Sequence, residues 1–123
     1  YKMSIALILL GALFIKHFIV DFPLQTPYHY LNKGTYGHPG GVQHALFHGV
    51  GTTLCFVLWA PFAAIILGAI DGLIHYHVDW AKVKINNKYG LTPTNSEKFW
   101  WLLGADQSAH YLTYIGLVAL VTP

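Results

Sequence analysis

Long apolar segments separated by short polar stretches dominate the chain. Apolar residues prevail in four segments, at about 3–22, 42–60, 62–81 and 98–121. Each segment is near the roughly 20 residues that a helix needs to cross the hydrocarbon core of a bilayer. The segments are too long and too uniformly apolar for the alternating strands of a membrane barrel. The pattern therefore predicts four membrane-spanning helices.

The connections between the segments predict how the helices are arranged. The second and third segments meet at Pro61 with almost no linker, which favours a tight antiparallel hairpin. Polar loops join the first segment to the second and the third to the fourth. We expect an all-α, integral membrane four-helix bundle with up-down-up-down topology, formed by a single domain over residues 1–123.

Composition and charge support a membrane protein and set its orientation. The chain is 54% hydrophobic and 10% charged, with a mean hydropathy of +0.45, whereas an ordinary soluble domain is about 25% charged. Lysines gather in the two long loops, so the positive-inside tendency predicts both termini outside the cytoplasm. The net charge of +2 gives no basis for binding nucleic acid.

Ionisable residues interrupt every apolar segment, and they come in pairs with i, i+4 spacing. The pairs are His17 and Asp21, His44 and His48, His75 and Asp79, and Asp106 and His110. This spacing places both side chains of a pair on one helix face. In an up-down-up-down bundle, all four pairs fall at the same side of the membrane. The sequence therefore predicts one shared polar centre.

A metal centre explains this concentration of charge better than separate His–Asp ion pairs, although such pairs remain the simpler alternative. An ionised Asp costs about 2.5–3.5 kcal/mol at the centre of a membrane helix, and bound cations would supply the missing positive charge. Eight or nine ligands are too many for one tetrahedral ion, so we expect two divalent ions. Imidazole and carboxylate ligands suit zinc, manganese, iron or nickel. The predicted metal ligands are His17, Asp21, His44, His48, Asp71, His75, Asp79, Asp106 and His110.

Other polar residues near these pairs have predicted roles in catalysis or support. Asp79 or Asp106 is a candidate general base where it is not a ligand. Lys82 extends the pattern of the third segment and is expected to hold a phosphate or carboxylate near the site, or to reach the membrane interface. Gln25 and Gln107 are candidate hydrogen-bond partners of the ligands.

Four remaining cationic or imidazole side chains are expected to lie away from the centre. Lys16 is predicted to face lipid headgroups. His29 and His38 fall in a polar loop and are predicted to be solvated. His77 follows His75 by two residues, which turns it to another helix face.

Several motifs together resemble a family of small bacterial and phage four-helix membrane proteins of unknown function. The motifs are "HFIVDFPLQ", a histidine at the start of the second segment, "HYHVDWAK" and "DQSAH", which cover nearly the whole chain in order. The resemblance implies a bacterial inner-membrane protein with a shared polar centre, and it implies no reaction. The matching positions are His17, Asp21, Gln25, His44, His75, Asp79, Lys82, Asp106, Gln107 and His110.

Three classes of function fit these predictions. The leading hypothesis is a membrane-embedded, metal-dependent hydrolase that acts on a lipid headgroup or on a phosphate or acyl ester. The second is a redox enzyme of the di-iron type, since membrane desaturases also use histidines with i, i+4 spacing. The third is a non-catalytic accessory subunit or ion carrier. Expected partners are membrane lipid and either further copies of the chain or a larger membrane complex.

Overall fold

A computed structural model describes residues 3–123, and within this range the chain is helical with no strand. The all-α prediction is therefore confirmed. The helices are α1 (Ile5–Asp21), α2 (Pro27–Tyr30), α3 (Pro39–Phe56), α4 (Ala64–Tyr89) and α5 (Glu97–Val121).

Local sequence signals set the ends of the helices. The Ser4 hydroxyl accepts a hydrogen bond from the backbone of Leu7 at the start of α1, and the Ser96 hydroxyl caps α5. Serine is favoured at such positions because its oxygen satisfies a free N–H group of the first turn. Gly90 ends α4 in a left-handed conformation with φ of 60°, which glycine adopts without steric cost.

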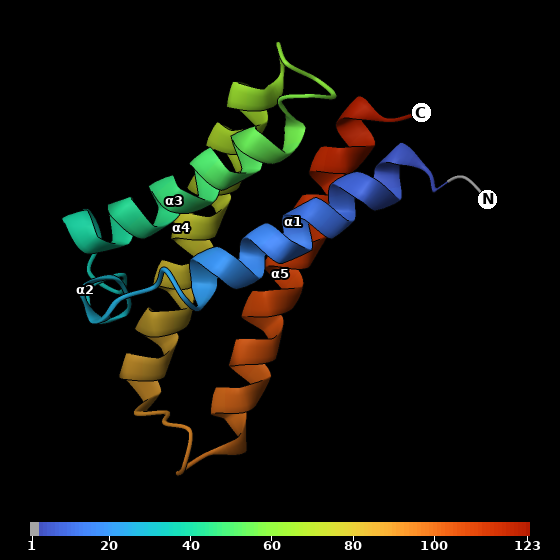
Figure 1. The fold of residues 1–123 in the computed structure, drawn as a ribbon. Helices are drawn as coiled ribbons and strands as arrows, with labels where there is room; N and C mark the ends of the chain where they lie inside the picture. Colours follow the sequence, from blue (N-terminus) through green and yellow to red (C-terminus); the bar gives the residue numbers. More distant parts are fainter. Residues whose placement is uncertain (1–2) are drawn as a thin grey trace.

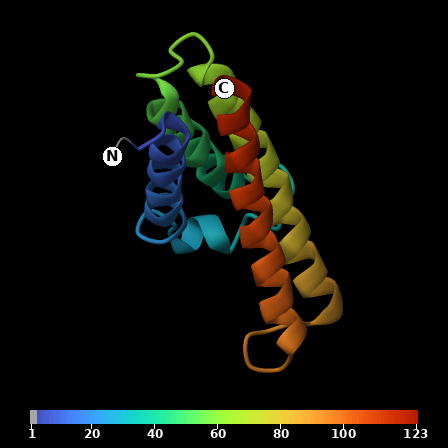
Figure 2. The same cartoon turned by 90° about the vertical axis from the view of Figure 1, so that its right-hand side faces the viewer.

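The four long helices form a ring in the order α1, α3, α4, α5, and each packs against its two neighbours. Successive long helices run in opposite directions, so the start of α1, the end of α5 and the α3–α4 connection lie toward one end of the bundle (Figures 1 and 2). The α4–α5 connection lies at the opposite end, where α4 and α5 extend beyond the end of α1 (Figure 2). The ring places the inward faces of all four helices around one interior.

Helices α3 and α4 approach most closely because glycines face each other across their interface. A Cβ atom added at Gly68 of α4 would collide with the Thr53 side chain and with the Gly49 carbonyl oxygen of α3. Small residues at such a crossing let two backbones come together.

The interior is divided along its length into an apolar half and a polar half. The apolar core lies toward the end of the bundle where α1 starts and includes Leu13, Phe56, Leu67, Tyr114 and Leu117. The histidines and aspartates lie further along the same interior, at the last turn of α1 and the first half of α3. One half of the bundle is therefore held by apolar packing, and the other half positions polar groups.

The prediction of an integral membrane protein is wrong. Within residues 3–123, no helix is both long enough and apolar enough to span a bilayer. Helix α1 has only 17 residues, and α4 includes Asp71, Asp79 and three lysines in its 26 residues. The predicted inner-membrane location, with both termini outside the cytoplasm, is therefore wrong as well.

The structure also changes the predicted boundaries. The third segment was expected to end near residue 81, but α4 continues to Tyr89 through residues whose polarity suggested a loop. Several of these residues, such as Lys84, Asn87 and Lys88, are exposed on the helix, and α4 ends only at Gly90. The first polar loop likewise contains the short helix α2.

Candidate metal centre

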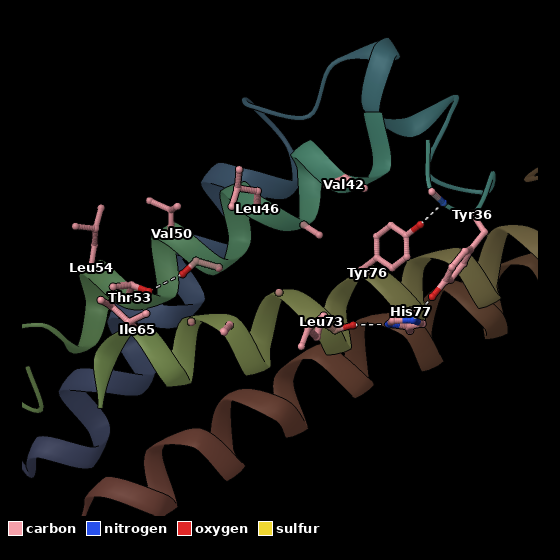
Figure 3. A pocket seen from close by; sticks show the side chains of 16 residues that line it. Tyr36, Val42, Leu46, Val50, Thr53, Leu54, Ile65, Leu73, Tyr76 and His77 are labelled. Carbon is pink, nitrogen blue, oxygen red and sulfur yellow. Dashed lines mark hydrogen bonds between the residues drawn. The ribbon is translucent and has the colours of Figure 1, made fainter. Parts of the chain in front are cut away.

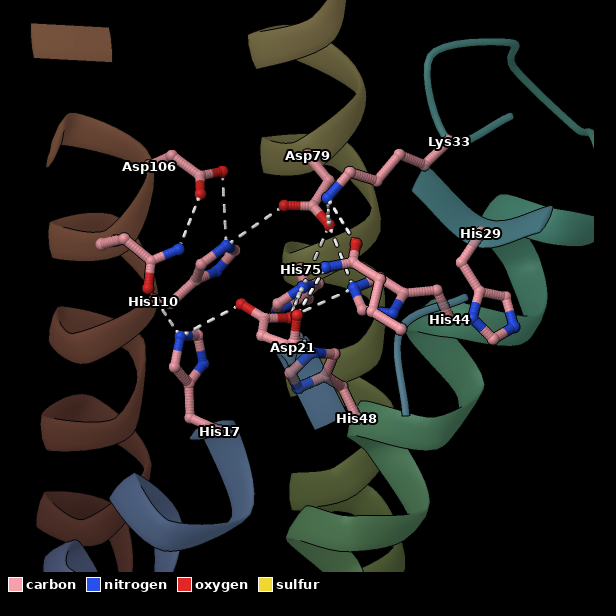
Figure 4. A network of polar contacts seen from close by, with 12 residues as sticks. His17, Asp21, His29, Lys33, His44, His48, His75, Asp79, Asp106 and His110 are labelled. Carbon is pink, nitrogen blue, oxygen red and sulfur yellow. Dashed lines mark hydrogen bonds and ion pairs between the residues drawn. The ribbon is translucent and has the colours of Figure 1, made fainter. Parts of the chain in front are cut away.

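Six histidine and aspartate side chains converge in the polar half of the interior, in two groups that could each hold a metal ion (Figure 4). Within each group, one ligand atom per residue lies within 4.8 Å of all the others, and every residue is buried. The first group is Asp21, His44, His48 and His75, and the second is His75, Asp79 and His110. Three helices, α1, α3 and α4, build the first group, and α4 and α5 build the second.

In the first group, three imidazoles surround one carboxylate oxygen. Asp21 Oδ1 lies 2.6 Å from His48 Nε2, 3.2 Å from His44 Nε2 and 3.6 Å from His75 Nε2. Ligands at zinc distances of about 2.0–2.1 Å in a tetrahedron lie about 3.3–3.4 Å from one another. The distances from Asp21 Oδ1 to His44 and His75 are therefore close to this spacing, while the distance to His48 is that of a hydrogen bond.

Asp79 makes matching contacts from the opposite side. Its Oδ2 lies 3.1 Å from His75 Nε2 and 3.4 Å from His44 Nε2, and its Oδ1 lies 3.3 Å from His110 Nε2. Asp21 divides its oxygens in the same way, because its Oδ2 lies 3.1 Å from His17 Nε2. Each of these two carboxylates thus directs one oxygen toward α3 and α4 imidazoles and the other toward an α1 or α5 imidazole.

The nitrogens of His44 and His75 show why protein contacts alone do not satisfy this centre. Neither ring nitrogen of either residue makes a hydrogen bond within residues 3–123, although both rings are fully buried. The nearby carboxylate oxygens lie at ion-pair distance but outside hydrogen-bond geometry. Buried polar atoms without partners are rare and costly, and a cation bound by both Nε2 atoms would satisfy one nitrogen of each ring. The donor set fits a divalent metal.

Burial keeps two of the imidazoles neutral. It lowers the pKa of His48 and of His75 to about 3, because the surrounding protein disfavours a charged ring. A histidine must be neutral to coordinate a metal. These two rings are therefore in the protonation state of a ligand across the physiological range.

Asp21 and His110 are charged instead. Burial alone would raise the pKa of Asp21, but its contacts with His44 and His48 outweigh burial and hold the pKa well below its usual range. Burial opposes a charge on His110, yet contacts with Asp106 and Asp79 raise its pKa to about 9. In the absence of metal, protons on histidine thus supply part of the positive charge that the carboxylates need.

Two predicted ligands border these groups without belonging to them. His17 Nε2 lies 2.7 Å from Gln107 Oε1, and its Nδ1 lies 2.7 Å from the hydroxyl of Tyr114. Asp106 Oδ1 lies 3.4 Å from His110 Nε2 and accepts no hydrogen bond within the described part of the chain, while Asp106 Oδ2 accepts one from Gln107. Gln107 therefore links the two residues, and the ligand roles of His17 and Asp106 stay predictions.

A third predicted ligand, Asp71, lies apart from both groups. Its Oδ2 accepts hydrogen bonds from Lys16 at 2.9 Å and from the Thr52 hydroxyl at 2.6 Å. Lys16 Nζ also donates to the Tyr114 hydroxyl at 3.0 Å and lies 3.1 Å from His48 Nδ1. Lys16, predicted to face lipid headgroups, is instead buried, and it connects Asp71 to the edge of the metal centre.

Two further buried residues were missed because they come from a segment expected to be a loop. Lys33 Nζ lies 3.2 Å from Asp79 Oδ2 and donates to Gln25 Oε1 at 2.9 Å. His29 was expected to be solvated but is 2% exposed, with its Nε2 2.7 Å from Gln43 Oε1. The sequence "TPYH" could have indicated a short helix here, because Pro after Thr favours a helical first turn. In the structure, the Thr26 N–H donates to His29 Nδ1.

A separate apolar groove lies on the outer face of α3 and α4 (Figure 3). Its lining shares no residue with the two metal-binding groups. His77 lies in this groove, where its Nε2 is 2.9 Å from the Tyr36 hydroxyl and its Nδ1 is 2.7 Å from the Leu73 carbonyl oxygen. His77 therefore faces away from the centre, on the side that its spacing from His75 predicts.

The fold and the site together define an all-helical protein with buried histidine and aspartate groups able to hold metal. The chain belongs to the family described as "Protein of unknown function (DUF3307)", which matches residues 9–123. Comparisons with curated proteins and with solved structures find no match. The predicted membership in a family of unknown function is confirmed, while the family match does not address the individual motifs or a bacterial or phage origin.

Proposed function

We propose that this protein is a hydrolase that binds two divalent metal ions and uses them in catalysis. The observation that supports this proposal is that the two oxygens of each carboxylate, Asp21 and Asp79, contact different histidines. Each directs one oxygen to the His44 and His75 side and the other to the His17 or His110 side. Asp21 and Asp79 would therefore help to hold both ions.

Each ion would have its own set of nitrogen ligands. His44, His48 and His75 would hold the first ion, together with Asp21 Oδ1. His110 would hold the second with the remaining oxygen of Asp79. His17 borders this second position through Asp21 Oδ2, and we assign it as a further ligand or as a support for the ligands.

Two such ions would polarise a water nucleophile and the ester oxygen under attack, and would stabilise the leaving oxygen. Asp106 is the proposed general base, because its buried Oδ1 accepts no hydrogen bond from any group in residues 3–123. In the reaction, the water oxygen bonds to phosphorus or to the acyl carbon as the bond to the leaving oxygen breaks. Asp106 accepts the proton of the water and returns it to the leaving alkoxide.

Elemental analysis of the purified protein tests the two-ion centre. We expect about two ions per chain in the wild type and a loss of at least one in Asp21→Asn. Asp71→Asn is the matched control, because Asp71 is also a buried aspartate but lies outside both groups, and it is expected to keep both ions. A wild type without stoichiometric metal, or equal metal in all three proteins, would contradict the proposal.

Activity and metal identity then separate the classes of function. Zinc or manganese with hydrolysis of p-nitrophenyl phosphate or p-nitrophenyl acetate, lost in Asp106→Asn, supports a hydrolase. Iron with a visible absorption band supports a di-iron redox protein instead.

A structural role for the ions is the second candidate, because all six residues of the two groups are buried. This role predicts metal that resists exchange and a large fall in Tm on chelation, with no ester hydrolysis. Hydrolysis that depends on added metal would exclude it.

A further inference from the structure

Two lysines flank the carboxylate of Asp79 from different parts of the chain. Lys33 follows α2 and places its Nζ 3.2 Å from Asp79 Oδ2. Lys82 of α4 places its Nζ 3.9 Å from Asp79 Oδ1 and 3.1 Å from Asp106 Oδ2. The two ammonium groups therefore reach opposite oxygens of one carboxylate that the proposed ions would use.

These two lysines lie between the metal centre and the protein surface. Their side chains are 11% and 13% exposed, whereas those of His44, His75 and Asp79 are 1%, 0% and 3% exposed. Gln25 Oε1 holds the Lys33 ammonium at 2.9 Å. Buried lysines are rare unless they are paired, and the anions that these two meet in the metal-free protein are Asp79 and Asp106.

The charge of the centre also points to an anionic ligand. Its buried groups include four aspartates and three lysines, Lys16, Lys33 and Lys82, which leave one net negative charge when the histidines are neutral. Two divalent ions would change this to a net charge of three positive. Uncompensated charge is costly in a buried environment. A dianion would remove two of the three charges, while a neutral acyl ester would remove none.

We propose that the site takes a phosphate monoester dianion, with Lys33 and Lys82 as the residues that bind its phosphoryl oxygens. This inference rests on the proposed two-ion centre and names its substrate class. Once metal ions take the charge of Asp79, Lys33 loses its carboxylate partner and becomes free to donate to the phosphate. Lys82 stays beside Asp106, and its ammonium group has N–H donors left for a phosphoryl oxygen. Lysine serves phosphate groups as a mobile point charge with three donors.

Titration calorimetry with inorganic phosphate tests this assignment on the metal-loaded protein. We expect Lys33→Met and Lys82→Met each to weaken phosphate binding at least 10-fold with unchanged metal content. Lys84→Met is the control, because Lys84 lies two residues from Lys82 on the exposed face of α4, and it is expected to bind phosphate like the wild type. Equal phosphate affinity in all three variants would overturn the proposal.

A second measurement on the wild type does not depend on the folding of the variants. Phosphate is expected to raise the Tm of the metal-loaded protein far more than acetate at equal ionic strength, and to inhibit any hydrolysis of p-nitrophenyl acetate competitively. A protein that holds two ions but does not respond to phosphate would overturn this inference alone. A protein that binds no metal would overturn the proposed function and this inference together.

The phosphate monoester can be a soluble metabolite or the headgroup of a lipid. Phenyl phosphate in solution and phosphatidic acid in phosphatidylcholine vesicles distinguish the two sources, with pure phosphatidylcholine vesicles as the control. Binding of either phosphate monoester supports the assigned class and identifies the source. Failure to bind both would contradict it.

Discussion

Two buried aspartates, Asp21 and Asp71, show how surroundings decide the role of a residue. Asp21 is surrounded by imidazole nitrogens that a metal can share. Asp71 is neutralised by the ammonium group of Lys16 and by the hydroxyl of Thr52. The same residue type therefore contributes to a candidate metal site in one place and to a closed ion pair in the other.

Removing one partner of the Lys16–Asp71 pair is expected to be much worse than removing both. Lys16→Met would leave the Asp71 carboxylate buried without its cation, at a cost of about 3–5 kcal/mol in the free energy of unfolding. The double variant Lys16→Met/Asp71→Leu should recover most of this loss, because a buried ion pair and an apolar pair of similar volume are close in stability. Urea denaturation of both variants measures the difference. A double variant as unstable as the single one would show that the contacts of Lys16 with His48 and Tyr114 matter more than its charge.

At the scale of helices, the close approach of α3 and α4 brings His44 and His48 within reach of His75. His48 and His75 stack with ring centroids 3.5 Å apart, and His75 stacks on His110 of α5 at 3.8 Å. At the α3–α4 crossing, Gly68 lies two turns before His75 on α4, and it meets Gly49, which directly follows His48 on α3. Close backbone contact beside the centre thus helps to set the spacing of the imidazoles.

Two glycine-to-alanine substitutions should therefore have opposite effects. Gly68→Ala would force α3 and α4 apart, and we expect it to lower the free energy of unfolding by about 1–3 kcal/mol. Gly104→Ala on the exposed side of α5 meets no atom within 4 Å, and alanine should raise stability there by up to about 1 kcal/mol. Thermal or chemical denaturation compares them. If Gly68→Ala left both stability and metal content unchanged, the close crossing would have no part in forming the centre.

At the scale of the whole molecule, the bundle concentrates its charged and imidazole groups in one half of a largely apolar interior. In the metal-free protein, these groups balance one another through protons on histidine. Burial lowers the pKa of His48 and of His75 to about 3, whereas contacts with two aspartates overcome burial and raise that of His110 to about 9. The stability of the metal-free fold is therefore linked to pH.

We expect the metal-free protein to be most stable near pH 6.5. Below this pH, His48 and His75 gain protons only in the unfolded chain, so stability falls by up to about 1.4 kcal/mol per histidine per pH unit. Above it, the stabilisation from charged His110 is lost as pH rises through about 9. Denaturant unfolding in the presence of a chelator between pH 5 and 10 measures this profile. A profile that is flat, or that is highest above pH 9, would contradict these protonation states.

The sequence by itself determined the helices and the helix faces that carry the centre. Apolar runs and polar connections indicate four long helices, and the i, i+4 pairs fix which side chains share a face, because both are local properties of the chain. The sequence also predicts that His44, His75 and Asp79 lie at the same level of the bundle, because neighbouring helices run in opposite directions. Local polarity misplaced the end of α4, because polar residues on an exposed helix face look like a loop.

Only the tertiary structure decided which of these polar groups meet. It paired Asp71 with Lys16, and it brought Lys33 from a presumed loop to Asp79. It also showed that no helix in residues 3–123 can span a membrane, although the composition is strongly apolar. Contacts between residues 46 or 55 positions apart depend on the rotation and depth of each helix in the bundle. Those quantities come from packing across the interior, such as the glycine contact of α3 with α4, and no local pattern contains them.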